Sequence, residues 1–140
     1  MNKIILIIFI ILIIILYLKK RYETFKEILI LKVKKAIDKK RGLMFVKNPL
    51  KYNHGLLFDF GSYVDIQFWM KNTFIPLDII YLDHNYKVIE YKENLIPLSE
   101  KMININKKFR YAIEVNAGTI KNNNIKKNDY INLKFVDNIK

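Results

Sequence analysis

The hydrophobic and polar positions divide the chain into an apolar N-terminal segment and a domain of short alternating segments. Residues 4–18 contain only Ile, Leu, Phe and Tyr, so a helix formed there is apolar on every face. At about 1.5 Å per residue this run covers about 22 Å, and lysine stems at both ends extend it towards a hydrocarbon core of about 30 Å. We therefore expect residues 1–21 to form an uncleaved transmembrane anchor that inserts in the membrane through residues 4–18.

A cleavable signal peptide is the alternative for this segment. Cleavage needs small residues after the apolar run, but residues 17–22 read Tyr-Leu-Lys-Lys-Arg-Tyr and the first alanine is Ala36. The basic cluster at residues 19–21 favours a cytoplasmic domain by the positive-inside rule. An N-terminal signal anchor usually exports the domain behind it, so the residues alone leave the side of the membrane open.

Beyond a short polar stalk at residues 22–26, alternation of apolar and polar side chains predicts a series of short strands. The predicted strands are residues 27–33, 55–58, 64–71, 77–82, 86–91, 110–115 and 130–136, with short helical pieces at 34–41 and 116–123. Short turns between neighbouring strands favour antiparallel pairing. We predict a mainly β domain over residues 27–140, at the margin of α+β. Its architecture is expected to be a small antiparallel, partly closed β-barrel or sandwich of about seven strands with one or two short helices.

Composition excludes several classes of site. The chain has no cysteine, which excludes disulfides and thiolate metal ligands. Its net charge of +12 could favour nucleic acid or anionic lipid, but no Arg-rich run or basic–aromatic interleaving supports nucleic acid, and enrichment in Ile, Lys and Asn explains the charge more simply. His54 and His84 are far apart and both in predicted turns. We expect no metal, no cofactor and no nucleic-acid partner.

The densest group of polar side chains is Trp69, Lys71, Asn72 and Asp78. Trp69 and Lys71 share one face of the strand predicted at residues 64–71, and a short turn brings Asp78 back towards Lys71. A functional interpretation is a shallow binding site in which Trp69 stacks on a sugar and its polar neighbours form hydrogen bonds. A structural interpretation is a turn shaped by Asn72, a cross-strand pair of Lys71 with Asp78, and a Trp69 that covers the end of the barrel.

Two further charged residues are weaker candidates. Arg41 precedes Gly42 and could make a bidentate contact with a carboxylate or phosphate, although a cation at a helix C-terminus is the simpler account. Glu114 lies between Ile113 and Val115. The pleat points it away from both, so we expect a solvated face rather than a general base.

Several segments resemble one known family. Residues 68–79, FWMKNTFIPLDI, closely resemble the signature of the DUF192 family of small domains, which has no established activity. Residues 41–45 (RGLMF), 111–118 (YAIEVNAG) and 125–129 (IKKND) are similar to its other blocks, in the expected order over about residues 27–136. Asn128 departs from the glycine usual in the closing turn, but asparagine also tolerates a left-handed backbone.

The resemblance implies a β-rich single domain that is often exported behind a signal or lipid anchor, and no reaction. It favours a domain outside the cytoplasm, with the cytoplasmic face as the alternative. We therefore expect a membrane-tethered binding or accessory module for an envelope glycan or a partner protein, with Trp69, Lys71, Asn72, Asp78 and Arg41 as candidate binding residues.

Two alternatives remain for the function. One is a hydrolase or lyase that uses Asp78 with Lys71, and the other is a structural interaction module. A deep pocket that holds a carboxylate of perturbed pKa would favour an enzyme, and an open aromatic platform would favour a binding module.

Overall fold

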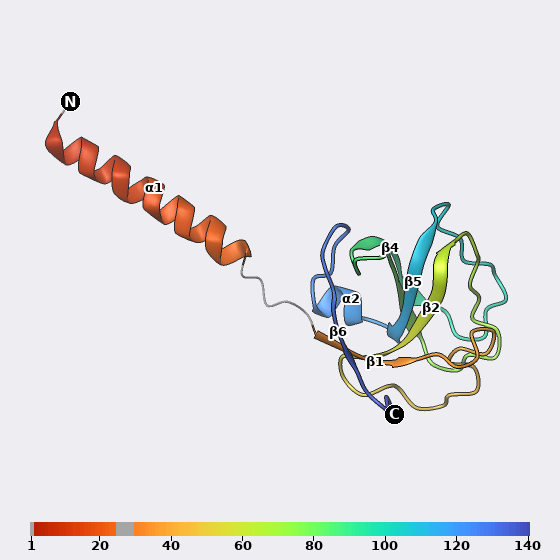
Figure 1. Cartoon of the computed structure of the whole chain (residues 1–140). Coiled ribbons are helices and arrows are strands. Elements are labelled where there is room, and N and C mark those ends of the chain that lie inside the picture. The colour runs from red at the N-terminus through yellow and green to blue at the C-terminus, as the bar shows by residue number, and fades with distance from the viewer. Residues whose placement is uncertain (1, 25–29) are drawn as a thin grey trace.

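The computed structural model describes residues 2–24 and 30–140, with side chains for residues 2–18 and 30–140 (Figure 1). In chain order its elements are α1 (Lys3–Thr24), β1 (Ile30–Lys35), β2 (His54–Val64), β3 (Leu77–Leu82), β4 (Val88–Leu95), β5 (Phe109–Asn116), α2 (Thr119–Asn122) and β6 (Asn132–Phe135). The prediction of a mainly β domain is confirmed, and of its two predicted helical pieces one is present as α2.

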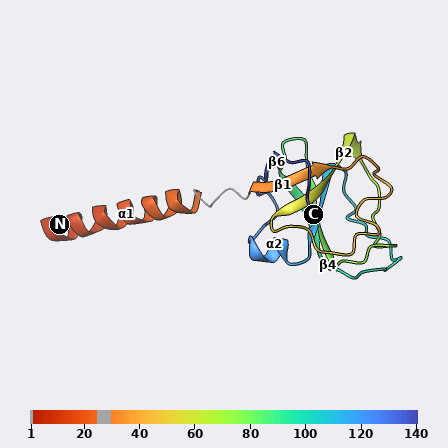
Figure 2. The same cartoon turned by 90° about the horizontal axis from the view of Figure 1, so that it is seen from below.

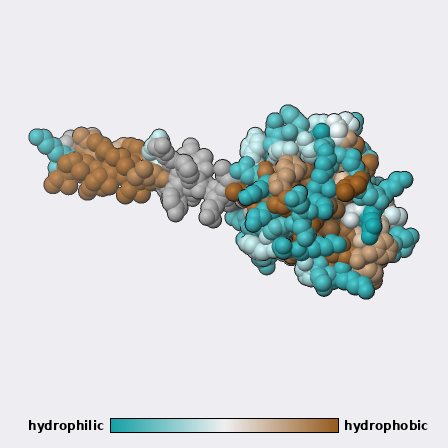
Figure 3. Space-filling view, turned by 60° about the horizontal axis from the view of Figure 1, so that its bottom comes forward, coloured by the Kyte–Doolittle hydropathy of each residue, from teal (hydrophilic) through white to brown (hydrophobic). Residues whose placement is uncertain are grey.

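The first helix, α1, does not support the predicted transmembrane anchor. Its side chains from Ile4 to Leu18 are exposed and give it an apolar surface (Figure 3). Among the described residues, no helix combines enough length with enough apolar character to cross a membrane, so the prediction of a transmembrane helix is wrong. The physical reason is that lysines bound the apolar run, whose rise of about 22 Å is short of a core of about 30 Å. Of the predicted stalk, residues 22–24 belong to α1, and 25 and 26 lie outside the described residues.

The strands form one open mixed sheet of six strands in the order β4-β3-β5-β2-β1-β6. β1 runs parallel to β2 and to β6, whereas the pairs β2–β5, β3–β5 and β3–β4 are antiparallel. The predicted antiparallel barrel or sandwich of about seven strands is therefore wrong. Residues 36–53 form a long connection between β1 and β2, and a long connection permits the parallel return that short turns forbid. A bridge between Lys87 and Tyr130 joins the segments just before β4 and β6 but does not grow into a ladder that would close the sheet.

One predicted strand is absent and one predicted helix is replaced by turns. The strand predicted at residues 64–71 is absent. Its first residue ends β2, and beyond that residue the described segment forms one isolated β-bridge, between Phe68 and Ile103. At the predicted helix over 34–41, the Asp38 carboxylate accepts the amides of Lys40 and Arg41 at 2.9 and 3.1 Å. Such a local side-chain bond competes with helical hydrogen bonding and fixes a turn.

Both faces of the sheet are buried. One face carries a cluster that includes Leu57, Ile80, Ile113 and Val115, and α2 covers it through Ile120. The other face carries a cluster rich in aromatic side chains, covered by the irregular segments around residues 36–50, 66–76 and 96–105. In both views α2 and these segments lie on opposite sides of the strands (Figures 1 and 2). The irregular layer, which is open to solvent at its rim, is therefore where side chains far apart in sequence can form a cleft.

Asp78 fastens three elements of this fold together. Its carboxylate lies on β3 and is fully buried. One oxygen accepts the amide of Asn94 on β4 at 2.8 Å, and the other accepts the amide of Ile120 in α2 at 3.1 Å. Both carboxylate oxygens are thus committed to the backbone, which is a structural role.

Replacement of Asp78 by alanine is expected to destabilise the domain, because the buried amide of Ile120 and the partly buried amide of Asn94 would lose their acceptor. We expect a loss of about 2–5 kcal/mol of unfolding free energy in urea denaturation. Lys71→Ala is the matched control, since its partly exposed ion pair with Glu100 at 3.4 Å should contribute less than about 1 kcal/mol. Equal shifts for the two variants would contradict the structural role of Asp78.

Candidate functional site

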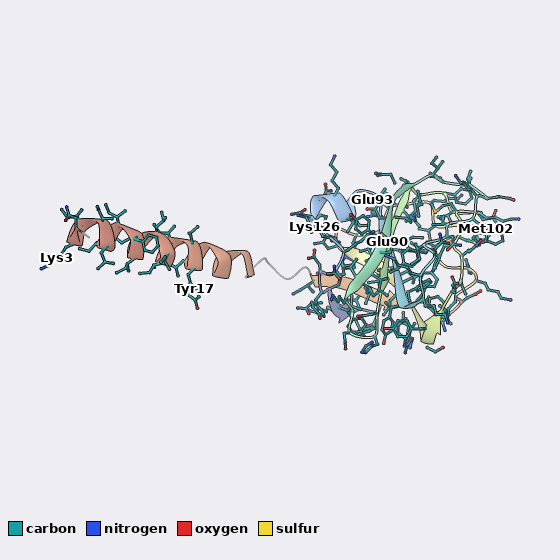
Figure 4. The ribbon with its side chains drawn as sticks, turned by 90° about the horizontal axis from the view of Figure 1, so that it is seen from above. Lys3, Tyr17, Glu90, Glu93, Met102 and Lys126 are labelled. Atoms are coloured by element: carbon teal, nitrogen blue, oxygen red, sulfur yellow. The ribbon has the colours of Figure 1, made fainter. Side chains whose placement is uncertain are left out.

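The irregular layer encloses a cleft of about 370 Å³ against the aromatic face of the sheet. The cleft is lined by residues 39–42, Met44, Phe58, Phe60, residues 66–69, Thr73, Met102 and Glu114. Met102 lies at the end of the domain that is farther from α1 (Figure 4). Side chains of the irregular layer, of β2 and of β5 thus form the walls of one cleft.

The carboxyl group of Glu114 lines this cleft from the central strand β5. Its side chain is only 6% exposed. The amide of Leu43 donates a hydrogen bond to Oε2 at 3.2 Å, and no other hydrogen bond to this carboxyl exists among the described residues. Burial raises the pKa of Glu114 to about 8, and the Leu43 amide opposes this shift only in part. The carboxyl is therefore mostly protonated at neutral pH.

The turn that carries Leu43 approaches Glu114 closely at Gly42, which has no side chain. A Cβ atom at Gly42 would lie 3.1 Å from Glu114 Oε2 and 3.1 Å from the Phe58 ring. The backbone at Gly42 also has a φ of +50°, which disfavours other residues. Gly42 therefore lets the turn close on the carboxyl.

Tyr81 lies beside Glu114 on the same face of the sheet. Ile79 pairs with Glu114 and Tyr81 with Ala112, so Tyr81 and Glu114 are diagonal neighbours across β3 and β5. The Tyr81 hydroxyl is buried and makes no hydrogen bond within the described part of the chain. Burial and the nearby Glu114 charge raise the pKa of Tyr81. The aromatic face thus holds two polar groups with unused hydrogen-bonding capacity.

The rim of the cleft is positively charged. Lys39, Lys40 and Arg41 are exposed, and none makes an ion pair with a described residue. Lys39 Nζ lies 5.4 Å from the centroid of the Phe60 ring, and Arg41 Cζ lies 5.9 Å from that of Phe45. These cations lie over aromatic rings and remain available to an anionic ligand.

The structure brings some of the predicted site residues to this cleft and separates others. Trp69, which is 40% exposed, and Arg41 line the cleft. Lys71 Nζ lies 5.3 Å from the Trp69 ring centroid, and its ion pair is with Glu100. Asn72 has a φ of 56°, and its carbonyl accepts the amide of Phe45 at 2.8 Å, which is a role in the turn.

The predicted proximity of Lys71 to Asp78 does not give an ion pair. Asp78 is buried and bonded to two backbone amides, whereas Lys71 lies on Trp69. Asp78 is also not among the residues that line the cleft. The binding role proposed for these residues from the sequence stays a prediction, carried by Trp69 and Arg41.

Glu114 is the central residue that the sequence interpretation placed wrongly. The pleat does point it away from Ile113 and Val115, but the face it joins is buried by the irregular layer. The signal that could have revealed this is the run Ala112-Ile113 before Glu114 and Val115 after it. A nearly continuous apolar run is typical of a strand that is buried on both faces.

The comparisons with known proteins give a family and two similar structures. The family model of DUF192, described as "Uncharacterized ACR", matches residues 19–133. A crystal structure of a candidate transcription regulator from Sinorhizobium meliloti 1021 is 35% identical, with a TM-score of 0.68 over 71% of this chain and 79% of that one. A protein of unknown function from Novosphingobium aromaticivorans DSM 12444 is 28% identical, with a TM-score of 0.64 over 70% of each chain. No curated protein matches the sequence.

The buried carboxyl predicts an unusual dependence of stability on pH. In the unfolded chain Glu114 releases its proton near pH 4.5, but in the folded domain only near pH 8. Its contribution to stability is therefore fully present below pH 4.5, falls as the pH rises between these values, and is constant above them.

Replacement of Glu114 by glutamine removes this titration and keeps the shape of the side chain. We expect the unfolding free energy of the native chain to fall by on the order of 3 kcal/mol between pH 5 and pH 8 relative to that of Glu114→Gln. Urea denaturation at several pH values measures the difference. Parallel pH profiles for the two proteins would show that Glu114 titrates normally.

Proposed function

The chain belongs to the DUF192 family, and we propose that its domain is a binding module for an acidic glycan, such as a polysaccharide of the cell envelope. The observation that carries the proposal is the composition of the cleft. A half-exposed Trp69 and the free cations of residues 39–41 surround an apolar cleft, and a mostly protonated carboxyl lines it. The family resemblance itself supplies no ligand.

Trp69 supports a sugar ligand because the apolar face of a pyranose ring packs well on an indole. Phe60 and Met102 extend the apolar wall of the same cleft, and Gln67 adds an amide that can donate or accept hydrogen bonds. A site of this kind is concave, largely apolar and supplied with a few polar groups, as small-ligand sites usually are.

The cations support an acidic rather than a neutral glycan. Lys39, Lys40 and Arg41 are consecutive at the rim, and no described acidic side chain forms an ion pair with theirs. Arg41 can make two parallel hydrogen bonds to a carboxylate, a geometry that lysine lacks. A uronic acid unit that stacks on Trp69 would place its carboxylate near these cations.

The cleft supports binding better than hydrolysis. Glycoside hydrolysis commonly uses a pair of carboxyl groups on either side of the scissile bond. Among the described residues that line the cleft, Glu114 is the only acid. The enzyme alternative with Asp78 and Lys71 has no support in their geometry, because the backbone occupies both oxygens of Asp78.

A partner protein has weaker support at this site. Phe45 and Phe74 are exposed and lie with ring centroids 6.4 Å apart, as at many protein contacts. Neither residue lines the cleft. The concave shape and the buried carboxyl are better explained by a small ligand than by a flat protein surface.

The single tryptophan of the chain makes the proposal directly testable, because the intrinsic tryptophan fluorescence reports on this cleft alone. The full chain can be titrated with oligogalacturonate and, as a neutral control of equal length, with cello-oligosaccharide. A polyoxyethylene detergent, which contains no sugar, should keep the exposed apolar helix α1 in solution. We expect a saturable change in fluorescence with the acidic sugar and none, or a much weaker one, with the neutral sugar.

Replacement of Trp69 tests the stacking contact by calorimetry, which needs no fluorescence. Trp69→Ala should weaken binding of the acidic sugar by about tenfold, equivalent to about 1.4 kcal/mol. Tyr130→Ala, at an exposed aromatic residue outside the cleft, should leave the affinity unchanged. Absence of saturable binding by the native chain, or equal weakening in both variants, would reject the proposal.

A further inference from the structure

We propose that Glu114 is the specificity-determining residue of this cleft, and that its neutral carboxyl donates a hydrogen bond to the bound acidic glycan so that binding is linked to a proton. This inference rests on the proposed function and adds the group inside the cleft that recognises the ligand. In this proposal the buried carboxyl of Glu114 is the contact that selects the ligand.

The hydrogen-bond geometry assigns different roles to the two carboxyl oxygens. Oε2 accepts the Leu43 amide at 3.2 Å, as a carbonyl oxygen does. The proton then belongs on Oε1, which makes no hydrogen bond within the described part of the chain. Since Glu114 lines the cleft, an Oε1 hydroxyl is available to donate to a ring or hydroxyl oxygen, or to the carboxylate of the sugar.

The surroundings of Glu114 hold the carboxyl in its neutral form but do not satisfy it. From β3 the uncharged Tyr81 faces it, and from the turn at residues 39–43 the charged groups are Lys39, Lys40 and Arg41 at the rim. No titratable side chain among the described residues that line the cleft comes from β2 or from residues 66–69. None of the three cations forms an ion pair with Glu114, so burial dominates and raises its pKa to about 8.

Ionisation of Glu114 would affect an acidic ligand in two ways. The carboxylate has no proton to donate, so the hydrogen bond from Oε1 is lost. Its negative charge also lies in a poorly solvated cleft, where it repels the negative charge of the ligand. Both effects have the same sign, so the affinity for an acidic glycan should fall as the pH rises through the pKa of Glu114.

The pH dependence can be measured in a range where other groups contribute little. Uronic acid carboxylates are ionised well below pH 6, and the ordinary pKa values of lysine and arginine side chains lie above about 10. His54 and His84 lie outside the cleft. A change of affinity between pH 7 and pH 9 therefore reports mainly on Glu114, and a Glu114 variant removes any other contribution.

The experiment is calorimetric titration of the full chain with oligogalacturonate at pH 7, 8 and 9. For a ligand that binds only the protonated form, the dissociation constant should rise about tenfold between pH 7 and pH 9. At pH 8, binding should take up a fraction of a proton, seen as a dependence of the binding enthalpy on the ionisation enthalpy of the buffer.

Two substitutions separate donation from shape. Glu114→Gln keeps a donor and carries no titratable proton, so binding should persist and become independent of pH, with no proton uptake. Glu114→Leu removes the donor and should weaken binding at pH 7 to about the level of the native chain at pH 9. The urea midpoint of each variant confirms that the domain is folded at the pH of the titration.

The outcomes distinguish this inference from the proposed function. Saturable binding of oligogalacturonate that is independent of pH in the native chain would overturn the role of Glu114 and leave the proposed function standing. Retained affinity in Glu114→Leu at pH 7 would overturn it equally. Absence of binding at every pH would overturn both.

Discussion

The carboxyl group of Glu114 is held in a place where water cannot stabilise its charge. A buried carboxylate with one hydrogen bond costs free energy, and the protein meets this cost by keeping the group protonated. The packing around Glu114 is consistent with a neutral carboxyl. Gly42 leaves out a side chain that would crowd the carboxyl, and Leu43 supplies a backbone amide that the carboxyl accepts. The aromatic cluster can then pack up to the carboxyl without enclosing an unpaired charge.

The topology of the sheet explains how such a group can also be accessible. Because β1 and β2 are parallel, residues 36–53 must cross from one end of the sheet to the other. The crossover is irregular and lies on the aromatic face with residues 66–76, and the cleft is the space between these two segments and the sheet. A purely antiparallel meander would connect its strands by short turns and would leave no such layer.

The local pattern predicts the strands better than their arrangement. β3 has the bounds predicted for residues 77–82, because five of its six side chains are apolar and turn residues flank them. Apolar and polar side chains alternate regularly over residues 64–71, which also predicts a strand. Beyond the end of β2, however, that segment forms only the bridge at Phe68. There Phe68 and Met70 enter the core while Ile66 stays exposed, and the alternation does not indicate whether a neighbouring strand is available for pairing.

The sequence predicts the aromatic and cationic residues of the site, Trp69 and Arg41, but not the role of its acid, Glu114. Trp69 and Arg41 belong to segments that resemble family blocks, and both line the cleft. Glu114 also lies in such a block, but its chemistry depends on which layer covers the second face of the sheet. Parallel pairing of β1 with β2 decides this, and a sequence pattern does not contain that long-range information.

The hydrogen bond from the Phe45 amide to the Asn72 carbonyl has a consequence for how a ligand could be received. It joins the two segments that border the cleft, and both residues adopt left-handed backbone conformations to make it. Phe45 does so although a bulky side chain disfavours that conformation. We therefore expect the two segments that border the cleft to move together rather than to separate from each other. A ligand would meet a cleft that is already shaped, and little of its binding free energy would be lost to the ordering of loops.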